Sequence, residues 1–263
     1  MAKKPAWVVK KERAARDEAR RSVWLFGMHA VEAALRNPRR EKLRLVVTKN
    51  AEARLAAAIA EAGLPAEIAD PRRFHAPLDA GSVHQGAALE ARPLDWGRWQ
   101  EVCAPRPGDA APRLVLLDRV TDPHNVGAVL RSAEVFGARA VIAPARHSAP
   151  ETGALAKSAS GALERQPYLR VPNLAEAMRA LSETGYALVG LAAEAEDALG
   201  AACAAEAGRP LGLVLGAEGP GLRALTRDRC DRLARIGAAG VFGSLNVSNA
   251  AAVALYAAQA AEG

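Results

Sequence analysis

The feature that most constrains the fold is a regular alternation of apolar runs and helical patterns in the second half of the chain. Five runs rich in aliphatic and β-branched residues predict buried strands at residues 114–118, 138–143, 186–192, 211–216 and 232–237. Helical spacing predicts helices at residues 125–137, 173–185 and about 245–261. Because such alternation implies crossover connections, we expect an α/β domain with a mostly parallel sheet covered on both faces.

The first half predicts a second, smaller α/β unit. Helical patterns span residues 27–38 and 51–63, and short strands are predicted at residues 43–48, 66–70 and 86–93. Residues 96–112 hold Pro105, Pro107, Gly108 and Pro112 with little periodicity, which indicates a linker. We therefore expect a domain over residues 23–95, a linker over 96–112 and a domain over 113–263.

Length and composition limit the class of protein. A chain of 263 residues fits two domains of roughly 100 to 200 residues each, or one large α/β domain with an extension. No run approaches the roughly 18 apolar residues of a membrane span, and the first 22 residues are too charged for a signal peptide. The widely spaced Cys103, Cys203 and Cys230 indicate neither a disulfide framework nor a zinc site. We expect a soluble, cytoplasmic protein without a metal.

Residues 1–22 form a basic arm. They carry eight basic and three acidic residues, a net charge of +5, whereas the other residues hold only the remaining +1 of the total of +6. Neutralising phosphates releases condensed counterions, so this arm favours a nucleic-acid partner. The alternative is a solvated tail that aids solubility.

The first unusual segment follows the strand at 114–118. In open α/β sheets, ligands bind beyond the carboxyl ends of the strands. If Asn125 lies in the turn before the helix, its amide and the guanidinium of Arg131 can both face the strand ends, and a guanidinium matches a phosphate bidentately. The alternative is that Asn125 caps the helix and Arg131 forms a surface ion pair.

The second unusual segment is LVLGAEGPGL, residues 213–222. Its glycines allow close approach of a ligand to the backbone, and Glu218 supplies a carboxylate that can accept hydrogen bonds from a ribose or an amine. A dinucleotide fingerprint should instead follow the first strand and open a helix, so a nicotinamide-dependent oxidoreductase is excluded. The alternative is an ordinary glycine-rich turn.

The third unusual segment covers residues 236–256. Three glycines precede four polar residues, Ser244, Asn246, Ser248 and Asn249, at the start of the Ala-rich helix. One polar residue is enough to cap a helix, so the surplus suggests a ligand site. The many alanines that follow allow close packing against another helix or subunit.

In this order, the segments DPHNVGAVLRSAEVFGA, LVLGAEGPGL and SLNVSNAAAVALY resemble the three signature motifs of the SpoU (TrmH-type) class of SPOUT RNA methyltransferases. FGMHAVEAAL (26–35) and VHQG (83–86) resemble the L30e-like RNA-binding domain that precedes the catalytic domain in the 23S ribosomal RNA guanosine 2′-O-methyltransferases of this class. The chain departs from the pattern at Asn249, commonly a small apolar residue, and at the IGAAG loop beginning at Ile236.

The resemblance implies a C-terminal trefoil knot, S-adenosylmethionine as cofactor, and a homodimer that brings the active site together. The residues that match the cofactor site are Leu215, Gly216, Gly219, Ile236 and Leu245. The residues that match the polar catalytic positions are Asn125, Arg131, Glu218, Ser244 and Asn246.

The chemistry implied is transfer of an activated methyl group to a ribose 2′-hydroxyl. The enzyme must align that hydroxyl and help to remove its proton, and positioning supplies most of the effect. Because a guanidinium stays protonated in proteins, we interpret Arg131 as a phosphate clamp that also stabilises the developing alkoxide.

The resemblance thus predicts 2′-O-methylation of a guanosine in large-subunit (23S) ribosomal RNA. Two alternatives are a transfer RNA ribose methyltransferase and a non-catalytic RNA-binding ribosome-assembly factor of the same fold. The L30e-like half favours ribosomal RNA, and the full polar set favours an enzyme.

Overall fold

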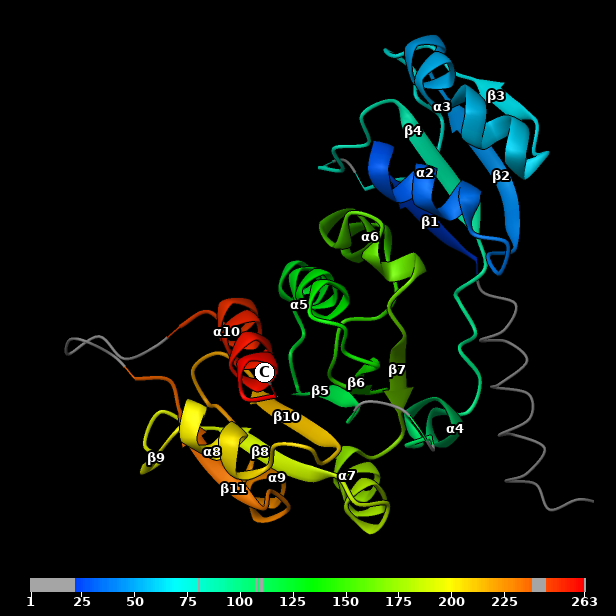
Figure 1. Ribbon diagram of the computed structural model, residues 1–263. Coiled ribbons are helices and arrows are strands. Elements are labelled where there is room, and N and C mark those ends of the chain that lie inside the picture. Colours follow the sequence, from blue (N-terminus) through cyan, green and yellow to red (C-terminus); the bar gives the residue numbers. More distant parts are fainter. Residues whose placement is uncertain (1–21, 80, 107, 109–110, 238–244, 263) are drawn as a thin grey trace, which may run out of the picture. The chain divides into compact units, whose positions relative to one another are not determined.

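The computed structural model describes residues 22–79, 81–106, 108, 111–237 and 245–262 (Figure 1). These residues form two compact units. The first comprises the chain up to Asp95 together with Glu151–Lys157, and the second comprises Trp96–Pro150 and the chain from Ser158 onward. Most of the basic arm, residues 1–21, lies outside the described residues. Within the described ranges, no helix has both the length and the apolar character needed to cross a membrane.

The first unit is a four-stranded mixed sheet in the order β1-β4-β2-β3. Strand β4 runs antiparallel to β1 and β2, and β3 runs parallel to β2. The elements are β1 (Val23–Phe26), α2 (Met28–Arg36), β2 (Lys42–Val47), α3 (Lys49–Ala62), β3 (Ala66–Ile68) and β4 (Ala87–Ala91). The pattern missed β1 because four residues are too few to show a periodicity.

Both faces of this small sheet are covered. Helices α2 and α3 pack together, and α2 contacts β1 and β4 while α3 contacts β2 and β3. On the other face Phe26, Val46 and Ala88 form a cluster with Ala69 and Ala76, against which Phe74 and Ala154 pack. Alternate residues of each strand therefore serve two small cores, as the two-residue period of a strand requires.

The second unit contains a seven-stranded sheet in the order β7-β6-β5-β10-β8-β11-β9, in which every pairing is parallel. The prediction of a mostly parallel α/β sheet is confirmed. Its strands are β5 (Arg113–Asp118), β6 (Ala140–Pro144), β7 (Tyr168–Val171), β8 (Ala187–Leu191), β9 (Asp197–Ala198), β10 (Leu211–Gly216) and β11 (Arg232–Arg235). Strands β7 and β9 were not expected from the sequence, because runs of four and two residues carry little pattern.

Helices cover both faces of this sheet, as predicted. One face carries α7 with α4 and α9, and the other carries α5, α8 and α10 (Figure 1). The helices of this unit are α4 (Trp99–Cys103), α5 (Pro123–Val135), α7 (Leu174–Glu183), α8 (Leu199–Ala205), α9 (Ala224–Asp228) and α10 (Val247–Ala260), with one 3₁₀ turn, η1 (Ala162–Glu164). Helix α6 (Gly153–Ala159) falls mainly within the first unit.

Residues 96–112, expected to form a linker, act as a linker only in part. It begins the second unit, and Trp96, Trp99, Val102 and Cys103 pack against the core on the α7 face of the sheet. Trp99, Val102 and Cys103 form one face of the short helix α4, and Trp96 lies three residues before that helix; the surrounding prolines concealed this pattern.

Gly127 lies where helix α5 passes very close to another segment. A Cβ atom there would lie 2.6 Å from Ser158 Cβ and 2.8 Å from the backbone nitrogen of Ala159. We expect Gly127→Ala to lower the free energy of unfolding by about 1–3 kcal/mol, because the two segments must separate. Urea unfolding followed by circular dichroism measures this change.

The matched control is Gly200 in α8, around which a Cβ atom would meet nothing within 4 Å. Gly200→Ala should raise the free energy of unfolding by roughly 0.5–1 kcal/mol, because alanine is the better helix former. Equal effects of the two substitutions would contradict the close packing at Gly127.

Candidate functional site

Two of the three unusual segments meet because β5 and β10 are neighbours in the sheet. The chain runs outward from β5 through β6 to β7, then crosses to β8 and returns to β10 beside β5. Asp118, the last residue of β5, pairs in register with Gly216, the last residue of β10. This reversal of strand order is where open parallel sheets bind their ligands.

The loop after β10 turns back sharply on its own strand. A Cβ atom on Gly216 would lie 2.1 Å from the carbonyl carbon of Gly221, so only glycine fits there. The backbone nitrogen of Gly221 donates a hydrogen bond to the carbonyl oxygen of Ala217 at 2.9 Å, and Gly219 and Gly221 have φ of 83° and 66°. The loop is therefore a fixed turn that carries Glu218 at its tip.

The same loop is anchored to the end of β5 by a buried charge. The carboxylate of Asp118 is fully buried and accepts hydrogen bonds from the backbone nitrogen of Arg223 at 3.0 Å and from its Nε at 2.7 Å. A buried carboxylate needs such partners to offset its loss of hydration. Asp118 therefore fixes where the loop ends.

Three of the predicted catalytic side chains are in direct contact. The Nδ2 of Asn125 donates to Oε1 of Glu218 at 3.2 Å, and the Nδ2 of Asn246 donates to Oδ1 of Asn125 at 2.9 Å and also to Oε1 of Glu218. The backbone nitrogen of Val247 donates to that same Oε1 at 3.4 Å. We call Asn125, Glu218 and Asn246 the amide–carboxylate cluster.

The cluster leaves one carboxylate oxygen available. Oε1 of Glu218 accepts all three of these hydrogen bonds, and Oε2 has no partner among the described residues. Glu218 is exposed. The cluster can therefore offer a fixed hydrogen-bond acceptor to a hydroxyl group of a ligand.

Asn246 also begins helix α10. Its Oδ1 accepts a hydrogen bond from the backbone nitrogen of Ser248 at 2.9 Å, which caps the helix, while its Nδ2 faces the cluster. One residue thus serves both the helix end and the site. Ser244 lies outside the described residues.

The two predictions about Asn125 and helix α5 need correction. Asp122 is the cap of α5, with its Oδ1 accepting from the backbone nitrogen of His124 at 2.9 Å, so the alternative that Asn125 caps the helix is wrong. Asn125 does not lie in the preceding turn either, because it is the third residue of α5. Pro123 starts the helix two residues earlier than the pattern predicted, as proline often does.

Arg131 is not brought into the cluster. Six residues along a helix place Asn125 and Arg131 roughly 120° apart around its axis. Arg131 is exposed and makes no hydrogen bond or ion pair with the residues that the structure describes. The alternative prediction, a surface ion pair of Arg131, is therefore also not met among the described residues.

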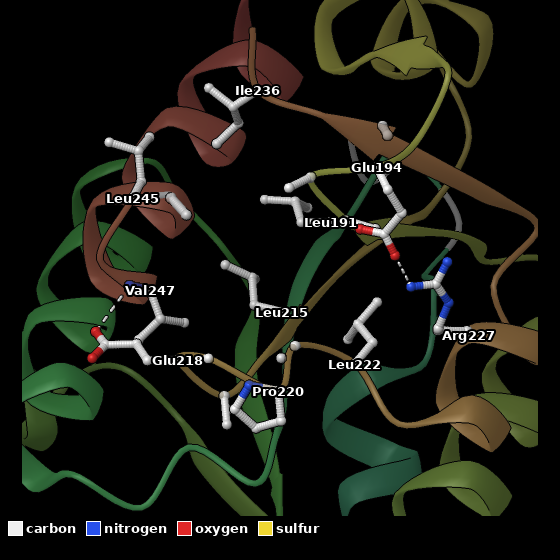
Figure 2. Close-up of a pocket in the computed structure, with 18 of the residues that line it drawn as sticks. Leu191, Glu194, Leu215, Glu218, Pro220, Leu222, Arg227, Ile236, Leu245 and Val247 are labelled. Carbon is white, nitrogen blue, oxygen red and sulfur yellow. Dashed lines mark hydrogen bonds and ion pairs between the residues drawn. The ribbon is translucent and has the colours of Figure 1, made fainter. Parts of the chain in front are cut away.

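A cavity of about 460 Å³ lies beside the cluster (Figure 2). This volume is within the range of roughly 300–1,000 Å³ of small-molecule sites. All five residues predicted to contact a cofactor line it, namely Leu215, Gly216, Gly219, Ile236 and Leu245. The walls come from the carboxyl ends of β8, β10 and β11 and from the start of α10, so they combine apolar side chains with free backbone groups.

An ion pair that the sequence did not reveal also lines the cavity. The guanidinium of Arg227 on α9 bonds to the carboxylate of Glu194, which follows β8, and this hydrogen bond lowers the pKa of Glu194 (Figure 2). Leu191, at the end of β8, lines the same wall. The segment that holds Leu191 and Glu194 contains no sequence motif. These residues reach the cavity only because β8 lies next to β10.

Neither thiol chemistry nor a metal cluster is favoured in the described part of the chain. Burial raises the pKa of Cys103 and of Cys230 to about 12, so both thiols stay protonated near neutral pH. Among the described residues, no group of three histidine, cysteine or acidic side chains is placed to hold a metal ion. Besides backbone groups, the polar groups that line the cavity are the carboxylates of Glu194 and Glu218 and the guanidinium of Arg227.

Two family models match the chain, one in each half. Residues 112–256 match the SpoU rRNA Methylase family, and residues 24–96 match the RNA 2′-O ribose methyltransferase substrate binding family. The first match spans all three unusual segments of the sequence.

Curated relatives extend the similarity over most of the chain. The 23S rRNA (guanosine-2′-O-)-methyltransferase RlmB of Yersinia pestis is 41% identical over 88% of this chain and 94% of that protein. The protein of the same name from Pseudomonas putida is 39% identical, with the same two coverages.

Solved structures share the fold. The SpoU methyltransferase AviRb from Streptomyces viridochromogenes in complex with AdoMet has a TM-score of 0.75 at 23% identity, covering 95% of this chain and 92% of that one. The AdoMet-bound rRNA methyltransferase from Sinorhizobium meliloti also has a TM-score of 0.75 at 23% identity, covering 99% and 97%.

Proposed function

The chain belongs to the SpoU rRNA methylase family, and we propose that it transfers a methyl group from S-adenosylmethionine to the ribose 2′-hydroxyl of a guanosine in 23S ribosomal RNA. The observation that carries this proposal is the amide–carboxylate cluster beside an apolar cavity at the ends of β5 and β10. The named activity of relatives at about 40% identity over 88% of the chain supports the substrate.

The cavity fits the proposed cofactor. Leu215, Ile236 and Leu245 offer apolar surface for a purine ring, and backbone groups near Gly216 and Gly219 offer hydrogen bonds to its polar edge. The close turn at Gly216, which lines the cavity, requires glycine, since any side chain there would meet the backbone of Gly221. When bound, S-adenosylmethionine supplies a methyl group activated by its sulfonium charge.

The cluster then serves the substrate hydroxyl. Oε1 of Glu218 is fixed by two amides and a backbone nitrogen, which leaves Oε2 to accept a hydrogen bond from the ribose 2′-hydroxyl and orient its oxygen. Asn125 and Asn246 act as positioning residues, because they hold the carboxylate in one geometry. Orientation of this kind provides a large part of the rate enhancement in two-substrate reactions.

We propose that Arg131 binds an RNA phosphate, because its guanidinium is exposed and has no partner among the described residues. Its place on α5 also relates it to an exposed apolar surface. Arg131 stands four residues before Val135, so the two side chains share one face of α5. Val135 is 76% exposed, and Val253 and Tyr256 on the adjacent helix α10 are also exposed. Phe136 joins the two helices through an edge-to-face contact with Tyr256 at 6.3 Å.

Exposed apolar side chains on two adjacent helices are typical of a protein interface. We propose that a second copy of the chain covers these side chains in a homodimer, which would place Arg131 at the subunit interface and complete the site there. Because the chain belongs to this family, we also propose that its C-terminal domain contains a trefoil knot. Part of the segment expected to form it, residues 238–244, lies outside the described residues.

We propose that the first unit binds RNA, as the description of its matching family indicates. The basic arm at residues 1–22 would add a further RNA contact. A cytoplasmic location agrees with three cysteines that are free of disulfides.

The proposed activity is tested with the purified full chain, labelled S-adenosylmethionine, and either unmodified 23S ribosomal RNA or bulk transfer RNA. Digestion to nucleosides should yield labelled 2′-O-methylguanosine from ribosomal RNA alone. The Glu218→Ala variant, which lacks the acceptor for the hydroxyl, is the inactive control. Label only in transfer RNA would overturn the substrate, and absence of both label and cofactor binding would favour the non-catalytic alternative.

Arg131→Lys tests the phosphate clamp. Lysine keeps the charge but loses the bidentate fork, so we expect kcat/KM for RNA to fall by roughly tenfold or more. The dissociation constant of S-adenosylmethionine, measured by calorimetry, should not change. Arg179→Lys on α7, where the cation pairs only with surface carboxylates, is the matched control. Turnover of Arg131→Lys equal to that of the control would contradict the assignment.

Tyr256→Asp tests the homodimer. A charged side chain within an apolar interface should weaken the dimer by at least about tenfold, seen by light scattering after size exclusion. Leu225→Asp on α9, where leucine is 56% exposed, should leave the dimer intact. An unchanged dimer in Tyr256→Asp would mean that another surface holds the subunits together.

A further inference from the structure

Arg119 directly follows β5 and has a backbone conformation that is unfavourable for arginine. Its φ is 62°, in the left-handed region that suits glycine, and its side chain is exposed. Arg119 lines a second, smaller cavity of about 150 Å³, together with Asn125 and Glu218 of the amide–carboxylate cluster. The cation therefore stands beside the site at which the substrate hydroxyl is proposed to bind.

The strain at Arg119 is not compensated within the described residues. Gln85 has a similar φ of 54°, but its Oε1 accepts a hydrogen bond from the backbone nitrogen of Met28 at 3.1 Å. Arg119 makes no side-chain hydrogen bond or ion pair with the residues that the structure describes. Unfavourable backbone conformations of this kind concentrate at functional sites.

A second basic loop adjoins the first. It follows β6, the strand next to β5, and contains the exposed residues Arg146 and His147, of which His147 also has a positive φ of 60°. The backbone nitrogen of Ala149 donates a hydrogen bond to the carbonyl oxygen of Val120 at 3.3 Å, which joins the two loops. Because neighbouring strands lie about 5 Å apart, the two loops form one continuous edge.

The acidic groups near this edge make no ion pair with its arginines among the described residues. Asp118 is buried and paired with Arg223, and Oε1 of Glu218 is bonded within the cluster. Asp122 caps α5. Arg146, like Arg119, has no hydrogen-bond or ion-pair partner for its side chain in the described part of the chain. Two free guanidinium groups thus share the carboxyl edge of β5 and β6.

We infer that Arg119 and Arg146, with His147 beside them, bind phosphates of the RNA strand that flanks the target nucleotide. The inference rests on the proposed function, since the target ribose must lie at the amide–carboxylate cluster. Guanidinium groups bind phosphates bidentately and independently of base identity. These residues, named the β5–β6 basic edge, hold the strand in register while Glu218 meets the hydroxyl.

Arg119→Gly is a sharp test because glycine suits the positive φ and removes only the side chain. Its unfolding midpoint should equal or exceed that of the wild type. The partner variant is Arg146→Ala. The matched control is Arg229→Ala, which removes an exposed arginine ahead of the amino end of β11, at the opposite edge of this parallel sheet.

The measurement is binding of unmodified 23S ribosomal RNA transcript to the full chain at a series of salt concentrations, by filter binding. Each edge variant should weaken binding by about threefold to tenfold and reduce the log–log salt slope by about 0.7, the value for one phosphate contact to a single strand. The double variant should reduce the slope by about twice as much. In methyl transfer, KM for RNA should rise while the dissociation constant of S-adenosylmethionine stays unchanged.

Salt slopes equal to that of Arg229→Ala would overturn the inference. A weaker affinity for S-adenosylmethionine in Arg119→Gly would also overturn it, since Arg119 would then contact the cofactor. Failure of the proposed function is distinguishable, because the wild type would then form no methylated nucleoside in ribosomal RNA. In that case RNA binding by the edge variants still decides whether the basic edge contacts phosphates.

Discussion

Asp118 ends β5 with a fully buried carboxylate, and the position of the whole site depends on how that charge is compensated. Its register partner is Gly216, where the loop after β10 begins, and its hydrogen-bond partner is Arg223, where that loop has just ended. The loop between them, residues 217–222, is thus fixed at both ends to a single residue of β5. Moving a charge from water into the protein interior is unfavourable unless the charge is fully paired. The pairing of Asp118 with Arg223 therefore determines where the loop is attached. Glu218, at the tip of the loop, is placed as a consequence.

The amide–carboxylate cluster joins three segments that are far apart in the sequence. Asn125 comes from the first turn of α5, Glu218 from the loop after β10, and Asn246 from the cap of α10. The residues of the cluster also stabilise their own segments. Asn246, for example, caps helix α10 and donates a hydrogen bond to Glu218. Because the same groups stabilise the loop and helix ends, the geometry of the site is set by contacts within the chain itself. Preorganised groups of this kind need little rearrangement during the reaction.

The sequence predicted well those elements of the fold that depend on a local pattern of residues. The strand at 211–216, the helix closed by Gly63 and the parallel sheet all follow from periodicity and from glycine or proline signals. Short elements such as β7 and α4 escaped because four or five residues show no period, and α4 was hidden among prolines. For the site, the three motif segments were found, whereas the Glu194–Arg227 pair and the buried Asp118–Arg223 pair were not. Both pairs arise from the order of strands in the sheet, which a local pattern does not contain.

The arginines near the site divide into two groups, and the division bears on the substrate. Arg223 and Arg227 are bound to Asp118 and Glu194, so their charges serve the architecture of the loop and of the cavity. Arg119, Arg131 and Arg146 are exposed and have no such partner among the described residues. A small neutral substrate would give no reason to keep free cations around an amide–carboxylate cluster, since each repels the others and none contributes to the core. A polyanion changes that balance, because every phosphate it presents compensates one of these charges and releases counterions. The paired arginines thus shape the site, and the free ones suit it to RNA.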